Sequence, residues 1–294
     1  MSLHQYNMTN ILEKIIAQKK LEVAALDAAT LRRAAEQSLA PRDFLATIKR
    51  RRFAPRPSLI AELKRASPSK GILAPHLDLF QVADIYAQNG AAAISVLTDE
   101  KFFMGKLETL RQLREQQSPI TNHQVPLLRK DFTIDETQIY EARANGADAI
   151  LLIAAALTDD KHFADLHACA LSLGLTALVE VHDEAETERA LKLNDVKLIG
   201  INNRNLATFE VSLATTERIR PMISSDVAVV AESGIFTAAD VERLANINID
   251  AILVGEALVT SDDIPRKVRE LSGVTLSEAK GHYPDERDAS LRSA

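Results

Sequence analysis

Short continuous runs of Val, Ile, Leu and Ala recur along the chain roughly every 20 to 35 residues, a spacing typical of strands that alternate with helices. These runs predict eight strands, at residues 58–64, 93–98, 125–130, 148–153, 175–181, 196–202, 227–232 and 250–254. Unbroken apolar runs indicate parallel strands that are covered on both faces. The segments between them, such as LFQVADIYAQNG and TAADVERLANIN, have helical periodicity. Several of these segments end in a glycine that is typical of a helix C-terminus, namely Gly90, Gly146 and Gly174.

Eight such βα units in succession predict an α/β fold with a parallel sheet. The simplest closed arrangement of eight units is a single (β/α)8 TIM barrel, and a length of 294 residues suits one barrel of typical size. The alternative is a doubly wound open sheet. That fold usually has fewer strands and an early GxGxxG motif, which this sequence lacks.

Two segments lie outside this repeat. Residues 1–50 predict an N-terminal helical extension, because residues 10–50 have an amphipathic pattern. The apolar positions of this pattern are Ile11, Ile15, Ile16, Val23 and Leu26. We expect the extension to pack on the barrel, which occupies residues 51–273, and to cap one barrel mouth in preference to lying on a membrane. Residues 274–294 are polar and predict a flexible C-terminal tail.

Polar residues occur at or near the ends of five predicted strands, where a buried strand would ordinarily stay apolar. They are Glu62, Lys64, Lys130, Glu180, Asn202 and Glu232. Burying an unpaired charge is costly, so charges at these positions indicate a shared polar site. Each polar residue has the parity of apolar residues that precede it, and a barrel gathers the carboxyl ends of its strands around one mouth. The alternative, an isolated exposed charge, explains one such residue better than six on five strands.

A mixture of carboxylates, amines and an amide suits acid–base catalysis. A carboxylate near a lysine stays ionised, whereas two neighbouring carboxylates push one of the pair toward its protonated form. Such a site could hold both an acid and a base near neutral pH. A lysine in this setting also suits a carboxylate or phosphate ligand, or a Schiff base.

Glycine turns after the last two predicted strands indicate a phosphate site. ESG at 232–234 and VGEAL at 254–258 each precede a predicted helix. Glycine lets backbone N–H groups approach an anion, and a helix N-terminus favours negative charge. The loop RASPSKG at 65–71 fits either a mobile flap or an ordinary solvated loop. The adjacent residues Phe102 and Phe103 fit either ordinary packing or an aromatic wall for a planar substrate.

Composition narrows the classes of function. The formal net charge of −6 argues against a general nucleic-acid binder. The single cysteine, Cys169, cannot form an internal disulfide, and no apolar run reaches the length of a signal peptide or a membrane span, so we expect a cytoplasmic protein. The seven histidines are scattered without metal-binding spacing, so we expect no metal. The expected partner is a phosphorylated small molecule, with no nucleic acid and no membrane. A monomer is the expected state.

Seven stretches of the chain, taken in order, resemble the indole-3-glycerol-phosphate synthase family of tryptophan biosynthesis. They are IAELKRASPSKG, TDEKFFMG, LLRKDF, ALVEVH, GINNRNL, AESGI and LVGEAL, across roughly residues 58–258. The N-terminal extension also resembles the one that this family carries. The resemblance implies a carboxy-lyase that needs no cofactor. Its reaction would convert 1-(2-carboxyphenylamino)-1-deoxyribulose 5-phosphate to indole-3-glycerol phosphate, CO2 and water.

The same resemblance implies roles for individual residues. Lys130 is the principal general acid, and Glu180 is its general acid/base partner. Glu62 and Lys64 flank the reacting centre, with Lys64 near the anionic groups. The residues implied to orient the substrate and the catalytic amines are Asn202 and Glu232. The residues implied to bind the substrate are Ser67 and Arg204 at the anionic groups, Phe103 at the anthranilate ring, and Ser233, Gly234, Gly255 and Glu256 around the phosphate.

Two positions depart from many relatives. Lys106 follows Gly105 where many have Ser, and Glu256 stands where some have Ser. We expect the Glu256 carboxylate to point away from a phosphate, so that only its backbone N–H contributes. Two other functions stay open: another phosphate-binding barrel, such as a sugar-phosphate isomerase or a Schiff-base aldolase, and a non-catalytic barrel that senses a phosphorylated metabolite.

Overall fold

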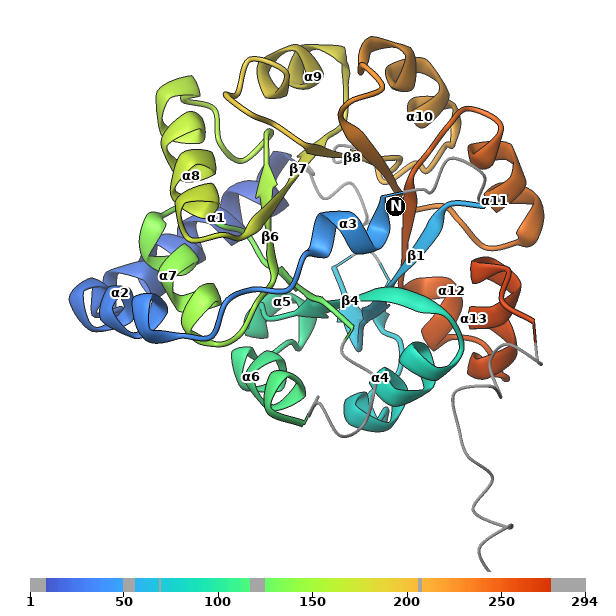
Figure 1. The fold of residues 1–294 in the computed structure, drawn as a ribbon, viewed down its shortest axis with the longest axis horizontal. Coiled ribbons are helices and arrows are strands. Elements are labelled where there is room, and N and C mark those ends of the chain that lie inside the picture. The colour runs from blue at the N-terminus through green and yellow to red at the C-terminus, as the bar shows by residue number, and fades with distance from the viewer. Residues whose placement is uncertain (1–8, 50–55, 69, 117–124, 206–207, 276–294) are drawn as a thin grey trace, which may run out of the picture.

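Eight parallel strands form a closed barrel in the computed structural model, which describes residues 9–49, 56–68, 70–116, 125–205 and 208–275 (Figure 1). The strands in barrel order are β1 (Ser58–Leu63), β4 (Ala91–Leu97), β5 (Leu127–Lys130), β6 (Ala149–Ile153), β7 (Thr176–Val181), β8 (Leu198–Asn202), β9 (Ala228–Glu232) and β10 (Ala251–Val254). All eight predicted strands are present, with small differences at their ends. Pairing of β1 with β10 closes the barrel, which confirms the predicted TIM barrel and excludes an open sheet.

Helices surround the barrel, as Figure 1 shows. They are α4 (Leu79–Gln88), α6 (Leu107–Gln116), α7 (Glu136–Ala144), α8 (Asp160–Ser172), α9 (Glu184–Ala190), α10 (Ala214–Ile219), α11 (Ala238–Ala245) and α13 (Ile264–Ser272), with the shorter α5 (Glu100–Phe103), η2 (Arg220–Met222) and α12 (Glu256–Val259). The three predicted C-terminal glycines have positive φ angles, of 104° at Gly90, 84° at Gly146 and 74° at Gly174.

Strand parity divides the apolar side chains into two layers. One cluster fills the barrel interior and includes Ile60, Leu128, Leu178, Val230 and Leu253. The other cluster lies between the strands and the helices and contains the strand residues of opposite parity. In β1, β5, β7 and β9 the predicted polar residue is two positions after an interior residue, so its side chain continues the interior column at the carboxyl end.

The N-terminal extension consists of three helices rather than one continuous helix, which corrects the single pattern expected over residues 10–50. They are α1 (Thr9–Ala24), α2 (Ala28–Gln37) and α3 (Phe44–Ile48). Asp27 and Asp43 cap the second and third helices, because their carboxylates accept the Thr30 and Ala46 N–H groups at 3.1 and 2.8 Å.

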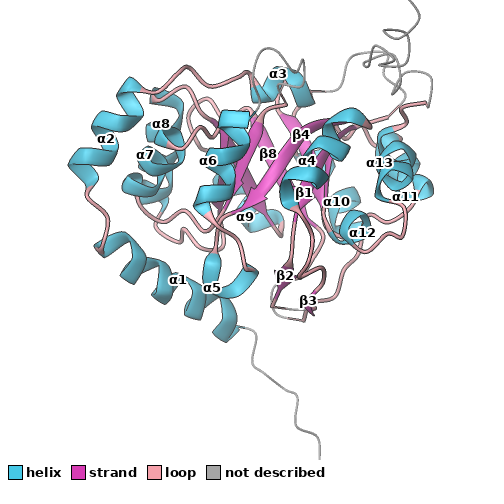
Figure 2. Ribbon diagram, turned by 90° about the horizontal axis from the view of Figure 1, so that it is seen from below, coloured by secondary structure: helices cyan, strands magenta, loops and turns pink. Residues whose placement is uncertain are grey.

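The extension reaches both ends of the barrel (Figure 2). Helix α3 lies at the amino ends of the strands, where Phe44 and Ile48 join the interior cluster and are fully buried. Helix α1 lies at the opposite end, beside α5 and near a small hairpin of β2 (Ala66–Ser67) and β3 (Gly71–Ile72). The division into residues 1–50, 51–273 and 274–294 stays a prediction, and most of the proposed tail, residues 276–294, lies outside the described residues.

Candidate active site

The carboxyl ends of the strands open into one pocket, and this pocket collects all the residues predicted to be catalytic or substrate-binding. The six predicted catalytic residues that line it are Glu62, Lys64, Lys130, Glu180, Asn202 and Glu232. The seven predicted binding residues that line it are Ser67, Phe103, Arg204, Ser233, Gly234, Gly255 and Glu256. The predicted convergence of these residues is therefore found, whereas the role of each residue stays a prediction.

Lys130 lies at the centre of the charged part of the pocket. Its Nζ atom is 3.1 Å from Glu180 Oε2 and 3.6 Å from Glu232 Oε2. Asn202 Nδ2 donates a hydrogen bond of 3.2 Å to the other oxygen of Glu180. Both carboxyl groups are buried, with relative exposures of 3% for Glu180 and 2% for Glu232. The lysine therefore shares its charge between two carboxyl groups that have little access to water.

This arrangement holds Lys130 and Glu180 in their charged forms. Burial alone would lower the pKa of Lys130, but the charges of Glu180, Glu232 and Glu62 outweigh burial and raise it. Burial alone would raise the pKa of Glu180, but the charge of Lys130 and contacts with His182 and Asn202 outweigh burial and lower it well below its usual range.

Glu232 behaves differently from Glu180. Burial and the neighbouring charge of Glu180 raise the pKa of Glu232 to about 8, despite the opposing effect of Lys130. Its Oε1 atom is buried and has no hydrogen-bond partner among the described residues. Of the two carboxyl groups, Glu232 therefore holds a proton more readily than Glu180, as the sequence-based argument about two close carboxylates expects.

Small residues make room for these carboxyl groups. A Cβ atom added at Gly200 would overlap Glu232 Oε1, and one added at Gly255 would lie 2.5 Å from Glu62 Oε1. Glu62 is in turn 3.2 Å from Lys64 Nζ. Gly255 has an ordinary negative φ of −123°, so its need for glycine comes from the Glu62 side chain rather than from backbone conformation.

The ESG turn after β9 has the unusual backbone that the glycine pattern suggested. Both Ser233 and Gly234 have positive φ angles, of 65° and 78°, and a non-glycine residue in this region is strained. Helix α11 begins after Thr237 and caps its own first turn with Asp240, which accepts the N–H groups of Phe236 and Thr237. Helix α12 begins after Gly255, and no side chain caps its first turn.

The expectation that the Glu256 carboxylate points away from a phosphate stays a prediction. The carboxylate contacts two cations, because Oε1 is 3.2 Å from Lys70 Nζ and Oε2 is 3.8 Å from Arg204 Nη2. The attraction of two cations accounts for this orientation. Lys106, the other departure from the relatives, is exposed and does not line the pocket.

Comparison with known proteins places these residues in a family. A sequence model described as indole-3-glycerol phosphate synthase matches residues 12–271. The protein of that name from Polaromonas naphthalenivorans (strain CJ2) is 48% identical over 270 residues, which cover 90% of this chain and 100% of that protein. The one from Roseiflexus sp. (strain RS-1) is 49% identical over 273 residues, 90% of this chain and 99% of that protein. This chain belongs to the indole-3-glycerol phosphate synthase family.

Solved structures of low identity agree with the fold of this family. 3-Hexulose-6-phosphate synthase from Salmonella typhimurium has a TM-score of 0.58 at 15% identity, covering 75% of this chain and 99% of its own. A mutant tryptophan synthase alpha-subunit from Pyrococcus furiosus has a TM-score of 0.53 at 18% identity, covering 74% of this chain and 98% of its own. At such identities the likeness concerns the barrel alone.

The charged part of this synthase-family site contains one residue that the sequence analysis missed. His182 Nε2 is 3.3 Å from Glu180 Oε1, and His182 Nδ1 is 3.0 Å from Glu186 Oε2. Burial alone would lower the pKa of His182, but its contacts with Glu180 and Glu186 raise it to about 10, so the imidazole is charged at pH 7. The available signal was the run VEVH, in which His182 has the same parity as Glu180.

More apolar residues line the pocket than the sequence analysis predicted. Phe103 lines it as expected and packs against Phe132, with ring centroids 5.9 Å apart. Ile11, Leu12 and Ile15 of α1 line the same pocket, although the sequence pattern suggested only that the extension caps a mouth. The RASPSKG loop forms the β2–β3 hairpin, and its mobility stays a prediction.

Two further expectations concern metal-binding clusters and membrane-spanning helices in the described part of the chain. It contains no cluster of three or more His, Cys, Asp or Glu residues arranged to hold a metal ion. None of its helices combines the length and the apolar character needed to cross a membrane.

Proposed function

We propose that this chain converts 1-(2-carboxyphenylamino)-1-deoxyribulose 5-phosphate to indole-3-glycerol phosphate, CO2 and water, with Lys130 as the principal general acid. Membership of the synthase family supports the reaction. The observation that supports the choice of acid is the contact of Lys130 Nζ with Glu180 and Glu232, at 3.1 and 3.6 Å. An ammonium held between two carboxyl groups can give up a proton and regain one inside the pocket.

Ring closure begins when the aromatic carbon that bears the carboxylate attacks the ketone carbon of the sugar chain. A carbon–carbon bond forms, and the ketone oxygen takes the Lys130 proton to become a hydroxyl. The bond to the carboxylate then breaks, CO2 leaves, and the released electron pair restores the aromatic ring. Since negative charge develops on the ketone oxygen, a fixed ammonium beside it stabilises the transition state before the proton moves.

The second half of the reaction removes the hydroxyl as water. A proton must leave the neighbouring carbon attached to nitrogen, so that its bonding electrons form the new double bond, and a second proton must reach the departing hydroxyl. We assign the first transfer to Glu180, whose lowered pKa keeps it ionised and able to accept a proton. We assign the second to Lys130, which Glu232 reloads. Asn202 orients Glu180 through its 3.2 Å hydrogen bond.

Substrate binding is assigned to the remaining residues of the pocket. The phosphate is bound by backbone N–H groups of Ser233, Gly234, Gly255 and Glu256, with Ser67 and Arg204 assisting. Phe103 covers the anthranilate ring, for which an apolar wall with Phe132 is suitable. Glu62 and Lys64, 3.2 Å apart, flank the reacting centre, and Lys64 attracts the carboxylate that becomes CO2.

A Schiff-base aldolase is a weaker candidate for this pocket. Forming a Schiff base requires a neutral amine, and the raised pKa of Lys130 keeps its amine protonated. The proposal names a phosphorylated small molecule as the partner. A monomeric state, a cytoplasmic location and the absence of nucleic-acid binding stay predictions.

A fluorescence assay tests the function directly. The purified protein should convert the named substrate to a fluorescent indole and release one CO2 per indole, and EDTA should not reduce the rate. The chain contains no Trp, so the protein contributes little background. Tight binding without turnover would instead support a metabolite sensor, and borohydride trapping of Lys130 with a keto-phosphate would support an aldolase.

A further inference from the structure

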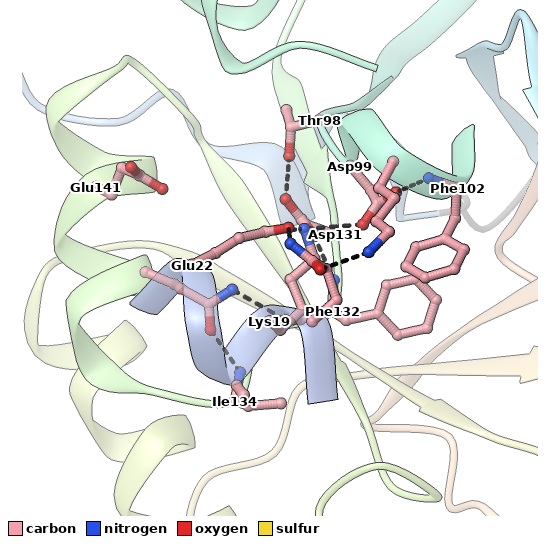
Figure 3. A network of polar contacts seen from close by, with 12 residues as sticks. Lys19, Glu22, Thr98, Asp99, Phe102, Asp131, Phe132, Ile134 and Glu141 are labelled. Carbon is pink, nitrogen blue, oxygen red and sulfur yellow. Dashed lines mark hydrogen bonds and ion pairs between the residues drawn. The ribbon is translucent and has the colours of Figure 1, made fainter. Parts of the chain in front are cut away.

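A buried lysine on the N-terminal extension lies close to the active site. Lys19 of α1 is only 2% exposed. Its Nζ atom is 2.9 Å from Asp99 Oδ2, 2.9 Å from Asp131 Oδ1 and 2.8 Å from Glu22 Oε2. Figure 3 shows this cluster between α1 and the segments that follow β4 and β5. A charge buried this deeply needs its partners, so these contacts fix α1 to the barrel.

The two buried partners of Lys19 each organise an adjoining turn. Asp99 follows β4 and caps α5, because its Oδ1 atom accepts the Phe102 N–H at 2.7 Å. Asp131 follows β5, and its Oδ1 atom accepts the Phe132 N–H at 2.8 Å. Asp131 Oδ2 also accepts the Thr98 hydroxyl at 2.5 Å. One ammonium therefore connects α1 with the two turns that carry Phe103 and Phe132, two of the aromatic residues of the pocket.

The elements joined in this way supply one apolar wall of the pocket. Helix α1 contributes Ile11, Leu12 and Ile15, α5 contributes Phe103, and Phe132 follows Asp131 directly. Ile15 precedes Lys19 by one helical turn, so both side chains lie on the same face of α1. A surface contact joins α1 and α5 as well, because Lys101 Nζ donates to Gln18 Oε1 at 2.7 Å.

We propose that Lys19 is a positioning residue: its ammonium holds α1 against Asp99 and Asp131 and thereby fixes the apolar wall that binds the aromatic part of the substrate. The lysine itself does not line the pocket, so it acts through α1 and the two turns. The choice of an aromatic ligand rests on the proposed function. The attachment of α1 by Lys19 does not, and the experiment measures the two separately.

The test replaces Lys19 with Met, which keeps the length of the side chain and removes its charge. In steady-state fluorescence assays, Lys19→Met should raise KM for the substrate by at least about tenfold and change kcat by less than about threefold, because the wall acts in substrate binding. Lys19→Arg should recover most of the lost affinity. Lys20→Met removes the same charge from an exposed position of α1 and should leave KM unchanged.

A double-mutant cycle separates positioning from general damage. Ile15→Ala in the parent should raise KM, but in the Lys19→Met background it should add little, because the wall is already displaced. Independent, multiplicative effects of the two substitutions would overturn the proposal, as would an unchanged KM in folded Lys19→Met protein. If Lys19→Met does not fold, Asp99→Asn takes its place, since asparagine can still cap α5 but lacks the charge, and it must also raise KM.

Hydrogen–deuterium exchange tests the attachment of α1 without the reaction. Amides of α1 should exchange faster in Lys19→Met than in the parent, whereas those of β6 and β7 should keep the parent rate. Unchanged protection of α1 would overturn the proposal even if the enzyme is active. Faster exchange in α1 together with no turnover by the parent would leave the attachment established and reject the proposed function.

Discussion

Replacing Lys130 with Met removes the central cation of the site and leaves its volume almost unchanged. The two carboxyl groups that contact Lys130 Nζ, at 3.1 Å for Glu180 and 3.6 Å for Glu232, then face each other inside the protein. No other lysine or arginine forms an ion pair with either group among the described residues, and His182 is the remaining cationic contact of Glu180. We therefore expect effects on both turnover and stability.

The distances set the size of the effect on stability. At an effective dielectric of about 20, the contact between Lys130 and ionised Glu180 is worth about 5 kcal/mol of Coulomb attraction, most of which offsets the cost of burying the charges. Removing one partner of a buried pair typically costs about 3–5 kcal/mol, and we expect a loss in this range at pH 8. Without Lys130, the two carboxyl groups would have higher pKa values in the folded protein than in the unfolded protein. A group of this kind lowers the free energy of unfolding as the pH rises through its folded-state pKa. The loss in free energy of unfolding should therefore be smaller at pH 5 than at pH 8.

Two assays measure these effects. Urea unfolding of the parent and Lys130→Met at pH 5 and pH 8 gives the stability difference and its pH dependence. Lys161→Met, at an exposed position of α8, makes the same chemical change on the surface and should leave the free energy of unfolding almost unchanged at both pH values. In the indole fluorescence assay, kcat of folded Lys130→Met should fall at least about a hundredfold, the usual contribution of a general acid.

Two results would contradict the proposed role of Lys130. A kcat within about threefold of the parent in folded Lys130→Met would reject Lys130 as the principal acid. An equal loss of stability at both pH values would mean that the stranded carboxyl groups do not cause the loss. Either result would leave the barrel and the family assignment intact.

Two further substitutions probe the charged residues around Lys130. Glu62→Gln keeps the shape of a side chain that is 3.2 Å from Lys64, and it should lower kcat more than it raises KM; a change in KM alone would contradict a role in the transition state. Glu256→Gln removes the carboxylate that contacts Lys70 and Arg204, and it should tighten competitive inhibition by inorganic phosphate by about threefold to tenfold, because two cations lose an internal counter-charge. Weaker inhibition would show that Glu256 organises the phosphate site rather than competing for its cations.

The sequence predicted the barrel and the composition of the site for one physical reason. Parallel strands that are covered on both faces rarely contain a charged residue except at their ends. Glu180 and Glu232 could therefore be recognised in the sequence, because apolar residues precede them. Parity then placed their side chains in the interior without any knowledge of distances. The same rule extended to His182, which the polar loop beyond β7 concealed.

The N-terminal extension was harder to predict, because its pattern of apolar residues continues across the two points where one helix ends and the next begins. The signals for those breaks were present, since Asp27 and Asp43 stand where they can cap the next helix. The sequence also contained a signal for Lys19, because its spacing of four residues from Ile15 places a lysine on the apolar face of α1. A sequence pattern does not show which strand ends meet that face, so the pairing of Lys19 with Asp99 and Asp131 required the three-dimensional structure.

The proposed reaction explains why the site keeps two carboxyl groups with different pKa values beside one lysine. When an ionised substrate carboxylate leaves as CO2 and the ketone oxygen leaves as water, each turnover consumes one proton. Lys130 has a raised pKa and is a reluctant donor unless a proton returns to it as the reaction proceeds. Two ionised neighbours would hold that proton more tightly, and two neutral neighbours would let Lys130 lose its charge in the buried pocket. One ionised and one protonated carboxyl group avoid both states. Because burial and Glu180 raise its pKa, Glu232 is the carboxyl group that we propose returns a proton to Lys130.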